Sequence, residues 1–338
     1  TAALAGWLWV RESTGRARAF ALGGIIITLS LMGVRAQIMF VGMAFLAAMV
    51  AAVSIYMICK DRRALRWWGM LAYSLVIVQG VLGGLRVTQL ADQIGIFHGT
   101  LAQVFLLVLA SLALFNSRWW KRIRAAASHK ELVPRVVRSH FFYATLLIFL
   151  QLIIGATMRH QHAGLPVWDF PKAHGQWWPA TDAASIASYN ASRTALQTSL
   201  HADNRIYDTQ GNPAVFLSTG NPISKQHISM HMIHRVMAVL ILGMVLGTVI
   251  LAHRKLGAAH VLSRLSLGWL GLILVQATLG ALTVLKYKPA DIATLHVVCG
   301  ALALGTGMMG ALISRNKVLP SLVEIPVNKA ELNMEATA

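Results

Sequence analysis

The sequence predicts an all-α fold: a polytopic bundle of transmembrane helices built from two duplicated four-helix halves, with an extra N-terminal hairpin. Three observations predict it, namely long apolar runs, the charge of the linkers between them and an internal repeat. Hydrophobic residues make up 56% of the 338 residues, charged residues only 12%, and the mean hydropathy is +0.60. A water-soluble domain cannot bury so much apolar sequence, whereas apolar runs of about 18 residues or more are typical of membrane-spanning helices.

Eight apolar runs are long enough to be considered as spans, and the first of them is short. They lie near 19–35, 37–59, 67–88, 95–115, 139–158, 229–252, 264–285 and 291–313. The opening stretch TAALAGWLWV is too short to cross a bilayer and lacks the basic region that begins a signal peptide. We therefore expect it to be the end of a helix that starts upstream, and the chain to be a fragment.

The linkers between the runs alternate in charge. Basic residues cluster in KDRRALR (60–66), NSRWWKRIRAAASHK (116–130) and HRKLGAAHVLSR (253–264), whereas the long loop at 160–228 is not basic. By the positive-inside rule the basic linkers face the cytoplasm or matrix, and the 160–228 loop faces the opposite side. The net charge of +18 is therefore a topology signal, and no nucleic-acid-binding motif accompanies it.

Aromatic and cysteine residues add little to the functional prediction. Trp168, Trp177 and Trp178 lie in the outer loop, where the aromatic-belt habit favours anchoring at the membrane interface. Cys59 and Cys299 are the only cysteines, and both lie in or at the end of apolar runs. Two such residues indicate neither a disulfide framework nor a zinc site.

An internal repeat relates the two parts of the chain. QGVLGGLRV at 79–87 matches QATLGALTV at 276–284 in the pattern Q-x-x-L-G-x-L-x-V. Each copy is followed by a short outer loop and a helix with one early histidine, His98 or His296, and the glutamine-to-histidine separations are 19 and 20 residues. The agreement of motif, spacing and topology predicts a duplication.

Three histidines are expected at the same depth in the outer half of the bundle. His98, His234 and His296 each lie a few residues into a span that enters from the outer side. His231 lies one turn further out on the face of His234, so we expect it at the outer rim. An ionisable residue inside the membrane is a functional hypothesis by default, and the plainer interpretation is an imidazole hydrogen-bonded to a neighbouring helix.

The chemistry of these side chains favours a porphyrin over a zinc ion. Zinc requires three or four close ligands, and the second half offers His234 and His296 with few other donors. Two histidines on facing helices with apolar space between them suit haem iron. Arg235 and Arg159 lie where haem propionates would reach the aqueous edge, although Arg235 would also fit snorkelling to lipid headgroups.

The remaining histidines are expected to be exposed to water. Those in or beside basic linkers are expected to be solvated, and those in the outer loop to be surface residues, some of which would line an entrance. The linker group comprises His129, His140, His253 and His260, and the outer group comprises His160, His162, His174, His201 and His227.

At this point several segments resemble one family, haem A synthase. Four segments resemble the second half of that family: GATMRHQHAGLPVWDFPKAHG (155–175), HMIHR (231–235), QATLGALTV and ATLHVVCGALAL (293–304). QGVLGGLRV and IFHGTLAQVFL (96–106) resemble the end of its first half. The resemblance covers roughly 67–313, and residues 19–59 match no part of the family pattern.

The resemblance implies an activity. Members of that family are eight-helix membrane proteins that oxidise the methyl group of haem O to the formyl group of haem A for terminal oxidase assembly. It implies a haem b held by His234 and His296, and the substrate haem O near His98. It also implies an electron donor, contacts with haem O synthase or oxidase assembly proteins, and residence in the bacterial cytoplasmic or mitochondrial inner membrane.

The first half departs from the family pattern. The family's other N-terminal ligand lies in an E-x-x-H-R motif whose Glu is linked to catalysis, and that motif is absent here; in the second half His231 occupies the place of the Glu. We expect the missing ligand and Glu to lie upstream of Thr1, with 19–59 as an inserted hairpin. The rival interpretation takes 37–59 as the motif helix, with Gln37 near the histidine position in a degenerate half.

Two other functions stay open on the sequence alone. A haem b electron carrier would share the histidine pairs without converting a substrate. A transporter would also show duplicated halves, but no pair of spans is broken by Gly or Pro, and Asp291 is the only acidic residue in a confident span. The expected segments are a helix end and linker at 1–18, the hairpin at 19–59, the end of the first half at 67–115, the second half at 139–313 and a tail at 314–338.

Overall fold

A computed structural model describes residues 36–61, 65–89, 91–125, 133–161, 165–202 and 222–315. The described residues form α-helices and include no β-strand. The helices are α3 (Ala36–Lys60), α4 (Leu65–Gln89), α5 (Asp92–Asn116), α6 (Arg118–Ala125), α7 (Arg135–His160), α8 (Ala183–Ala202), α9 (Lys225–Leu256), α10 (Val261–Leu285) and α11 (Ala290–Arg315).

Seven of these helices are long and apolar enough to cross a membrane: α3, α4, α5, α7, α9, α10 and α11. They coincide with the seven runs predicted from residue 37 onward, and the all-α membrane bundle is confirmed. In hydrocarbon a helix satisfies all its own backbone hydrogen bonds, which is why such apolar sequence takes this form. The predicted run at 19–35 lies outside the described residues, as do 1–18 and 316–338.

The boundaries of the later helices follow from local capping. Ser224 begins α9, and its hydroxyl accepts from the backbone N–H of His227 at 3.3 Å. His260 begins α10, and its Nδ1 accepts from the N–H of Leu262 at 3.1 Å. His260 is buried, so the expectation that it is solvated is wrong. It acts as the N-cap of α10 and accepts a hydrogen bond from a backbone N–H that has no partner within the helix.

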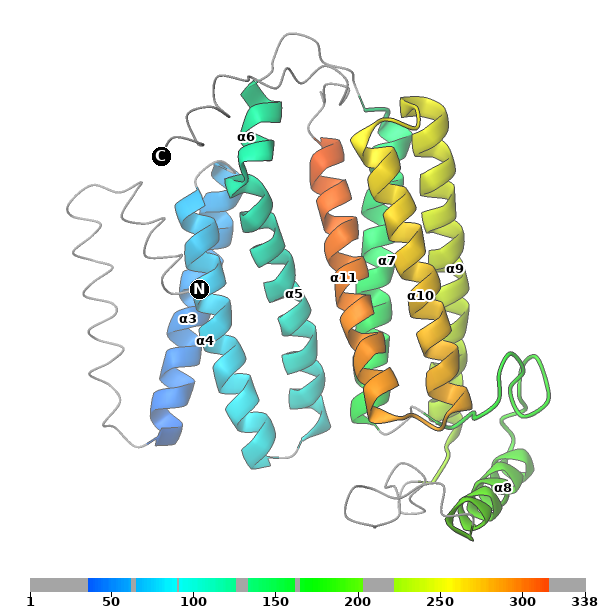
Figure 1. Ribbon diagram of the computed structural model, residues 1–338. Coiled ribbons are helices and arrows are strands. Elements are labelled where there is room, and N and C mark those ends of the chain that lie inside the picture. Colours follow the sequence, from blue (N-terminus) through cyan, green and yellow to red (C-terminus); the bar gives the residue numbers. More distant parts are fainter. Residues whose placement is uncertain are drawn as a thin grey trace, which may run out of the picture.

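The second group of spans forms a closed four-helix bundle. Helix α7 packs on α9, α9 on α10, α10 on α11, and α11 returns to α7 (Figure 1). Helices α9 and α11 are therefore diagonal partners across the bundle. In the first group α3 packs on α4 and α4 on α5, and α5 joins the groups by packing on both α7 and α11.

The two ends of the molecule differ in character. The short basic helix α6 lies at one end, while α8 and the outer loop lie at the other (Figure 1). The basic last turns of α9 and α11, which carry Arg254, Lys255 and Arg315, belong to the α6 end. Helices α5, α9 and α11 therefore begin at the α8 end, and this polarity fits the linker charges from which the topology was predicted.

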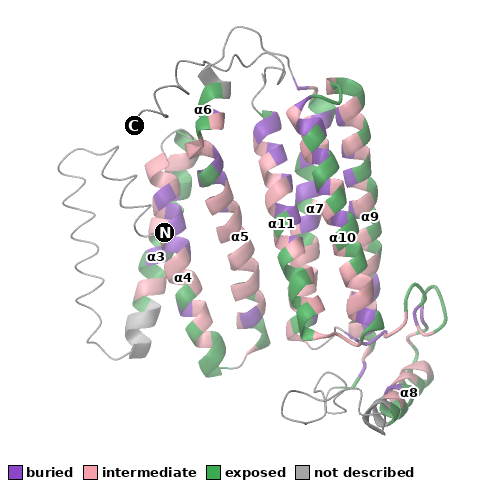
Figure 2. Cartoon of the chain, in the orientation of Figure 1, coloured by how far each residue is buried: buried purple, intermediate pink, exposed green. Residues whose placement is uncertain are grey.

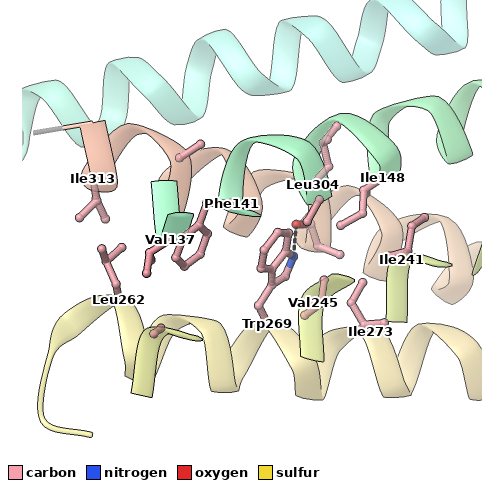
Figure 3. Close-up of a cluster of buried hydrophobic side chains, with 14 of the residues drawn as sticks. Val137, Phe141, Ile148, Ile241, Val245, Leu262, Trp269, Ile273, Leu304 and Ile313 are labelled. Atoms are coloured by element: carbon pink, nitrogen blue, oxygen red, sulfur yellow. Dashed lines mark hydrogen bonds between the residues drawn. The ribbon is translucent and has the colours of Figure 1, made fainter. Parts of the chain in front are cut away.

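An aromatic pair forms the centre of the second bundle (Figure 3). Trp269 of α10 stacks on Phe141 of α7 with ring centroids 5.6 Å apart and planes 5° from parallel. Both side chains are fully buried, and the indole Nε1–H donates to the carbonyl of Ala303 on α11 at 2.8 Å. One residue thus ties three helices together, because a buried indole N–H requires a partner.

Glycines on α11 let its neighbours approach closely. A Cβ at Gly307 would meet the ring of Trp269 and the hydroxyl of Thr145, and one at Gly310 would meet the ring of Phe141. Small residues at helix contacts are the usual means of close packing in membranes. Helix α11 is accordingly more buried than the described part of α3, and its buried residues lie in its C-terminal part, toward the α6 end (Figure 2).

Small residues also join the two groups of helices. A Cβ at Gly99 of α5 would lie 3.8 Å from the Cβ of Ala156 on α7, and one at Gly95 would collide with the ring of His160. Gly95 and Gly99 form a G-x-x-x-G pair on one face of α5. His160 is therefore part of the α5–α7 contact, which corrects its assignment to the loop surface.

Substitution of Gly307 tests this packing. We expect Gly307→Ala to destabilise the second bundle by about 1–3 kcal/mol, because its methyl group would overpack the space beside Trp269. Gly305→Ala is the matched control on the same helix, since a Cβ there meets no atom of the described chain within 4 Å. Thermal unfolding of the detergent-solubilised protein, followed by circular dichroism, measures both. Equal unfolding temperatures for the two variants would contradict the close packing.

Candidate functional site

Three histidines lie near the α8 end of the bundle. His98 on α5 and His296 on α11 occupy equivalent positions within the first two turns of their helices, and His234 lies within the first three turns of α9. All three helices begin at the same end of the molecule (Figure 1). The structure thus brings the three predicted side chains to a common outer layer of the bundle.

His98 and His296 are seated in the same way by the repeated motif. The Nε2 of Gln79 donates to the backbone carbonyl of His98 at 2.9 Å, and a Cβ at Gly83 would lie 3.3 Å from the Cε1 of His98. The imidazole of His296 likewise faces Gly280, where a Cβ would lie 3.1 Å from Cε1. Each ring therefore packs against the glycine of the motif on the preceding helix.

His234 packs against a third copy of the motif, on α7. Sequence reasoning did not recognise this copy. The Nε2 of Gln151 on α7 donates to the backbone carbonyl of His234 at 2.9 Å, and a Cβ at Gly155 would lie 3.5 Å from its Cε1. The stretch QLIIG repeats the Q-x-x-[LI]-G core of the other two copies. That signal was present in the sequence, but the histidine follows 83 residues later instead of about 20.

The tautomer of His296 follows from its hydrogen bonds. Its Nδ1 lies 3.1 Å from the carbonyl oxygen of Gln276, and since a carbonyl only accepts, Nδ1 must carry the proton. Nε2 then bears the lone pair, and the amide Nε2 of Gln276 lies 3.3 Å from it. Histidines that bind a metal through Nε2 use this same Nδ1–H donation to fix the ring.

His234 and His296 face the interior from diagonal helices. The two imidazoles are close enough to interact electrostatically. No group of three or more His, Cys, Asp or Glu side chains suited to a metal ion occurs among the described residues. Two imidazoles from opposite sides of a bundle suit a planar group with two axial positions better than a tetrahedral ion.

His98 has no histidine opposite it in the first group. The described helices α3, α4 and α5 contain no other histidine. Helix α3 packs on α4 as α9 packs on α10, so it takes the place that α9 has in the second group. This packing favours the interpretation of 37–59 as the motif helix; the side chain of Gln37 and all residues before 36 lie outside the described part.

The structure assigns Arg235 to the outer loop. Its guanidinium donates to the carbonyls of Asp169 at 2.7 Å and Lys172 at 2.9 Å, and reaches that of Pro171 at 3.5 Å. It also lies over the ring of Phe170, 5.6 Å from the centroid. Arg235 therefore clamps residues 169–172 onto the start of α9, a role that sequence reasoning missed.

His174 is the centre of the folded part of the outer loop. Its ring stacks on Tyr189 of α8 at 3.8 Å, and its Nε2–H donates to the carbonyl of Pro166 at 2.9 Å. Its backbone N–H donates to the carboxylate of Asp169 at 2.8 Å. Burial lowers the pKa of His174, with a smaller effect from Arg235, while the Pro166 hydrogen bond and Asp169 oppose the change.

His231 lies beneath this loop and not at the outer rim. Only 3% of the side chain is exposed, which corrects the rim position expected from sequence. His174, His234 and Arg235 are within electrostatic reach of it, and within the described chain its Nδ1 is buried without a hydrogen-bond partner. Met232 and Ile228 belong to the hydrophobic cluster that seals the loop onto α9.

A pair of cations lies at the outer mouth of the second bundle. Lys288, in the turn between α10 and α11, is half-buried; burial lowers its pKa, and Arg159 at the end of α7 adds to the effect. Tyr287 and Lys288 both have positive φ, 58° and 63°, and the backbone N–H of Lys288 donates to the carbonyl of Thr283 at 2.7 Å, which ends α10 in a tight turn. Sequence reasoning missed Lys288, because its neighbour Arg159 is far away in the chain and only the packing of the bundle brings them together.

An apolar groove lies apart from the three histidines, none of which lines it. It lies mainly between α5 and α11, has a volume of about 800 Å³ and is lined almost entirely by apolar side chains. It contacts Leu106 and Ala110 of α5 and runs along α11 from Val297 to Ile313. The groove has no titratable lining residue, so it does not supply the polar chemistry of the site.

Comparison with known proteins places the chain in a family. Residues 4–308 match the cytochrome oxidase assembly protein family. The chain belongs to that family. The match encloses 19–59 as well as the 67–313 region on which the resemblance rested.

A curated relative agrees with the family assignment. The chain is 27% identical over 227 residues to a protein named haem A synthase from Ehrlichia ruminantium, strain Gardel. The aligned region covers 66% of this chain and 53% of that relative. The chain thus spans about half the length of the relative that it matches.

Acidification tests the role of His174 in the outer loop. Because burial lowers the pKa of His174 below its ordinary value of 6.5, the folded loop binds a proton less readily than the unfolded loop. The stability of the loop should therefore be complete above pH 6.5 and decrease as the pH falls below it. Hydrogen exchange of 165–178, corrected for intrinsic rates, measures the change.

The control for this prediction is His174→Gln. Glutamine keeps a donor for the Pro166 carbonyl but does not titrate, so exchange in the variant should no longer depend on pH in this range. An unchanged pH dependence would assign the effect to a group other than His174.

Proposed function

We propose that this chain acts as a haem A synthase-like membrane oxidoreductase, which oxidises the methyl group of haem O to the formyl group of haem A for terminal oxidase assembly. Membership of the cytochrome oxidase assembly family and the relative named haem A synthase support this reaction. The observation that carries the proposal is the placement of His234 and His296 on diagonal helices, each against a glycine seat.

The residues present fit a haem b with two axial histidines. Nε2 of His296 is unprotonated, because its Nδ1–H is held by the carbonyl of Gln276. The amide of Gln276, 3.3 Å from this Nε2, would have to turn away for iron to bind there. The Nδ1 of His234 is buried without a partner in the described structure, so this ring is not committed to another hydrogen bond. Glycines at 155 and 280 leave room for both rings beside the supporting helices. His234 and His296 would therefore hold the haem.

Cations at the outer mouth suit the propionates of such a haem. Arg159 and Lys288 lie together at the ends of α7 and α10, and Lys288 is half-buried without a carboxylate near it among the described residues. Two haem propionates would supply the negative charge that this pair lacks. Arg235 also stays a candidate, but its guanidinium must then serve the propionate and the loop carbonyls together.

The outer loop contributes by closing the site. Arg235 holds residues 169–172 against α9, and the cluster around Val167, Ile228 and Met232 excludes water above His231. When bound, haem iron supplies the oxidising chemistry that an unactivated methyl group requires. The protein's own part is to orient the imidazoles, bind the propionates and keep water from the site.

His98 is assigned to the substrate, haem O. Its seat on Gln79 and Gly83 repeats that of His296, which supports a second porphyrin site in the first group of helices. The methyl group loses electrons in this reaction, so an oxidant is required; dioxygen, reduced with electrons from an external donor, would serve. The two groups of helices touch through α5, α7 and α11, so two bound haems would lie in adjoining parts of the bundle.

A haem b electron carrier is the second candidate. The observation that favours it is α3, which takes the place of the motif helix but contains no histidine or glutamate. A carrier would need only the pair in the second group. Conversion of haem O separates the two functions, because a carrier binds haem without producing haem A.

The haem b site is tested by its absorption spectrum. We expect His234→Ala and His296→Ala each to abolish the low-spin spectrum of the bound haem, because each removes one axial ligand. His253→Ala is the matched control on α9, since His253 lies in its last turn at the opposite end. An unchanged spectrum in both ligand variants would contradict the assignment.

The substrate site is tested by product formation. Purified protein incubated with haem O, a reductant and oxygen should form haem A, measured by extraction and chromatography. His98→Ala should lower that formation by about 100-fold or more while leaving the low-spin haem b spectrum intact, because His98 belongs to the other group of helices. Stable haem b with no haem A in the native protein would favour the carrier.

A further inference from the structure

One structural unit occurs three times around the histidines. A glutamine followed four residues later by a glycine lies in the outer half of α4, α7 and α10, and each pair faces a single histidine on a neighbouring helix. The units are Gln79 and Gly83 with His98, Gln151 and Gly155 with His234, and Gln276 and Gly280 with His296.

In each unit the side-chain oxygen of the glutamine lacks a hydrogen-bond donor. Throughout the described residues, the Oε1 atoms of Gln79, Gln151 and Gln276 are buried and accept no hydrogen bond. The Nδ1 atoms of His98 and His234 are also buried without a partner. A buried acceptor without a donor is unfavourable, and here it recurs beside a ring nitrogen with the same deficit.

The rings of His98 and His296 turn their Cε1–Nδ1 edge toward the glycine of the supporting helix. A Cβ at Gly83 would lie 3.3 Å from the Cε1 of His98 and 3.8 Å from its Nδ1, and Nε2 is not among the nearest atoms. A Cβ at Gly280 would lie 3.1 Å from the Cε1, 3.7 Å from the Nδ1 and 3.9 Å from the Nε2 of His296, and one at Gly155 would lie 3.5 Å from the Cε1 of His234. In His98 and His296, Nδ1 is therefore the ring nitrogen nearer to the glycine.

The geometry points to the three glutamines as positioning residues for the histidine ligands. In this arrangement the Oε1 of Gln79 would accept the Nδ1–H of His98, and that of Gln151 would accept the Nδ1–H of His234. All four atoms are buried without a hydrogen-bond partner in the described structure, so a small turn of the side chains would satisfy both atoms of each pair. The Gln276 unit does the same for His296 through its backbone carbonyl, as described above. Nε2 of each ring is thereby kept unprotonated for iron. This inference rests on the proposed function, because iron is the reason that Nε2 must be free.

A neutral amide suits this task better than the alternatives. It donates to the histidine carbonyl through Nε2, as Gln79 and Gln151 do at 2.9 Å, and it still has an acceptor for the ring. A carboxylate would carry a charge into the apolar bundle, and an aliphatic side chain would offer no acceptor. The glycine one turn further along removes the Cβ that would otherwise push the imidazole away.

The first test uses the protein without haem. In protein with ¹⁵N-labelled histidine, NMR reports which ring nitrogen carries the proton, and we expect His234 in the Nδ1–H form. Gln151→Met keeps the length of the side chain but removes the acceptor, so His234 should become a mixture of tautomers. Gln103→Met is the control, because Gln103 also has a buried Oε1 without a partner among the described residues but bonds no histidine.

The second test uses the haem-loaded protein. Gln151→Met should weaken haem binding by about 10- to 100-fold and raise the reduction potential, since loss of the acceptor makes the imidazole a poorer donor to iron. Gln151→Glu should restore binding and lower the potential below that of the native protein. Gln79→Met should change the tautomer of His98 and leave that of His234 unaltered.

The outcomes separate this inference from the proposed function. Unchanged tautomers and an unchanged potential in Gln151→Met would overturn the positioning role, even if haem A is formed. A changed tautomer with no haem A formed by the native protein would support the positioning role and reject the synthase. Gln276→Met, which keeps the backbone carbonyl, should leave the Nδ1–H form of His296 in place; its loss would contradict the division between side-chain and backbone acceptors.

Discussion

The contact between an imidazole and the neighbouring helix is the interaction on which the arrangement of this protein depends. Inside an apolar bundle a polar ring has no water to bind, so its partners must come from other helices. His98, His234 and His296 each receive a glutamine and a glycine from the helix beside them. This requirement sets the relative height of the helices and the choice of small residues at their contacts.

The second bundle has a tightly packed layer around Trp269 and a polar layer toward the α8 end, and the two differ in what they contribute. Around Trp269 and Phe141 the helices are packed tightly, with glycines at 307 and 310 in direct contact with aromatic rings. Toward the α8 end the interior holds imidazoles with unused hydrogen-bonding atoms. The tight layer supplies stability and the polar layer supplies the site, since unsatisfied groups are tolerated where surrounding structure compensates for them.

The outer loop links the site to the aqueous side. Arg235 lies next to His234 in the sequence but extends to the loop carbonyls, while His231 is buried beneath the same loop. Closing the bundle and folding the loop are therefore coupled through a few residues at the start of α9. The effect of pH on His174 is expected in this loop, because its partners Pro166, Asp169 and Tyr189 all belong to the outer segment.

The sequence by itself determined the spans from residue 37 onward, the repeat, and the equivalence of His98 and His296. These features are local: hydropathy sets a span, and the glutamine and histidine of each repeat are about 20 residues apart. Only the tertiary structure decided that Gln151 belongs with His234, since 83 residues and a whole loop separate them. It also decided that Arg235 binds the loop, that His231 is buried and that Lys288 meets Arg159. Such partners depend on which helices become neighbours, and helix packing is a property of the assembled bundle that no single segment encodes.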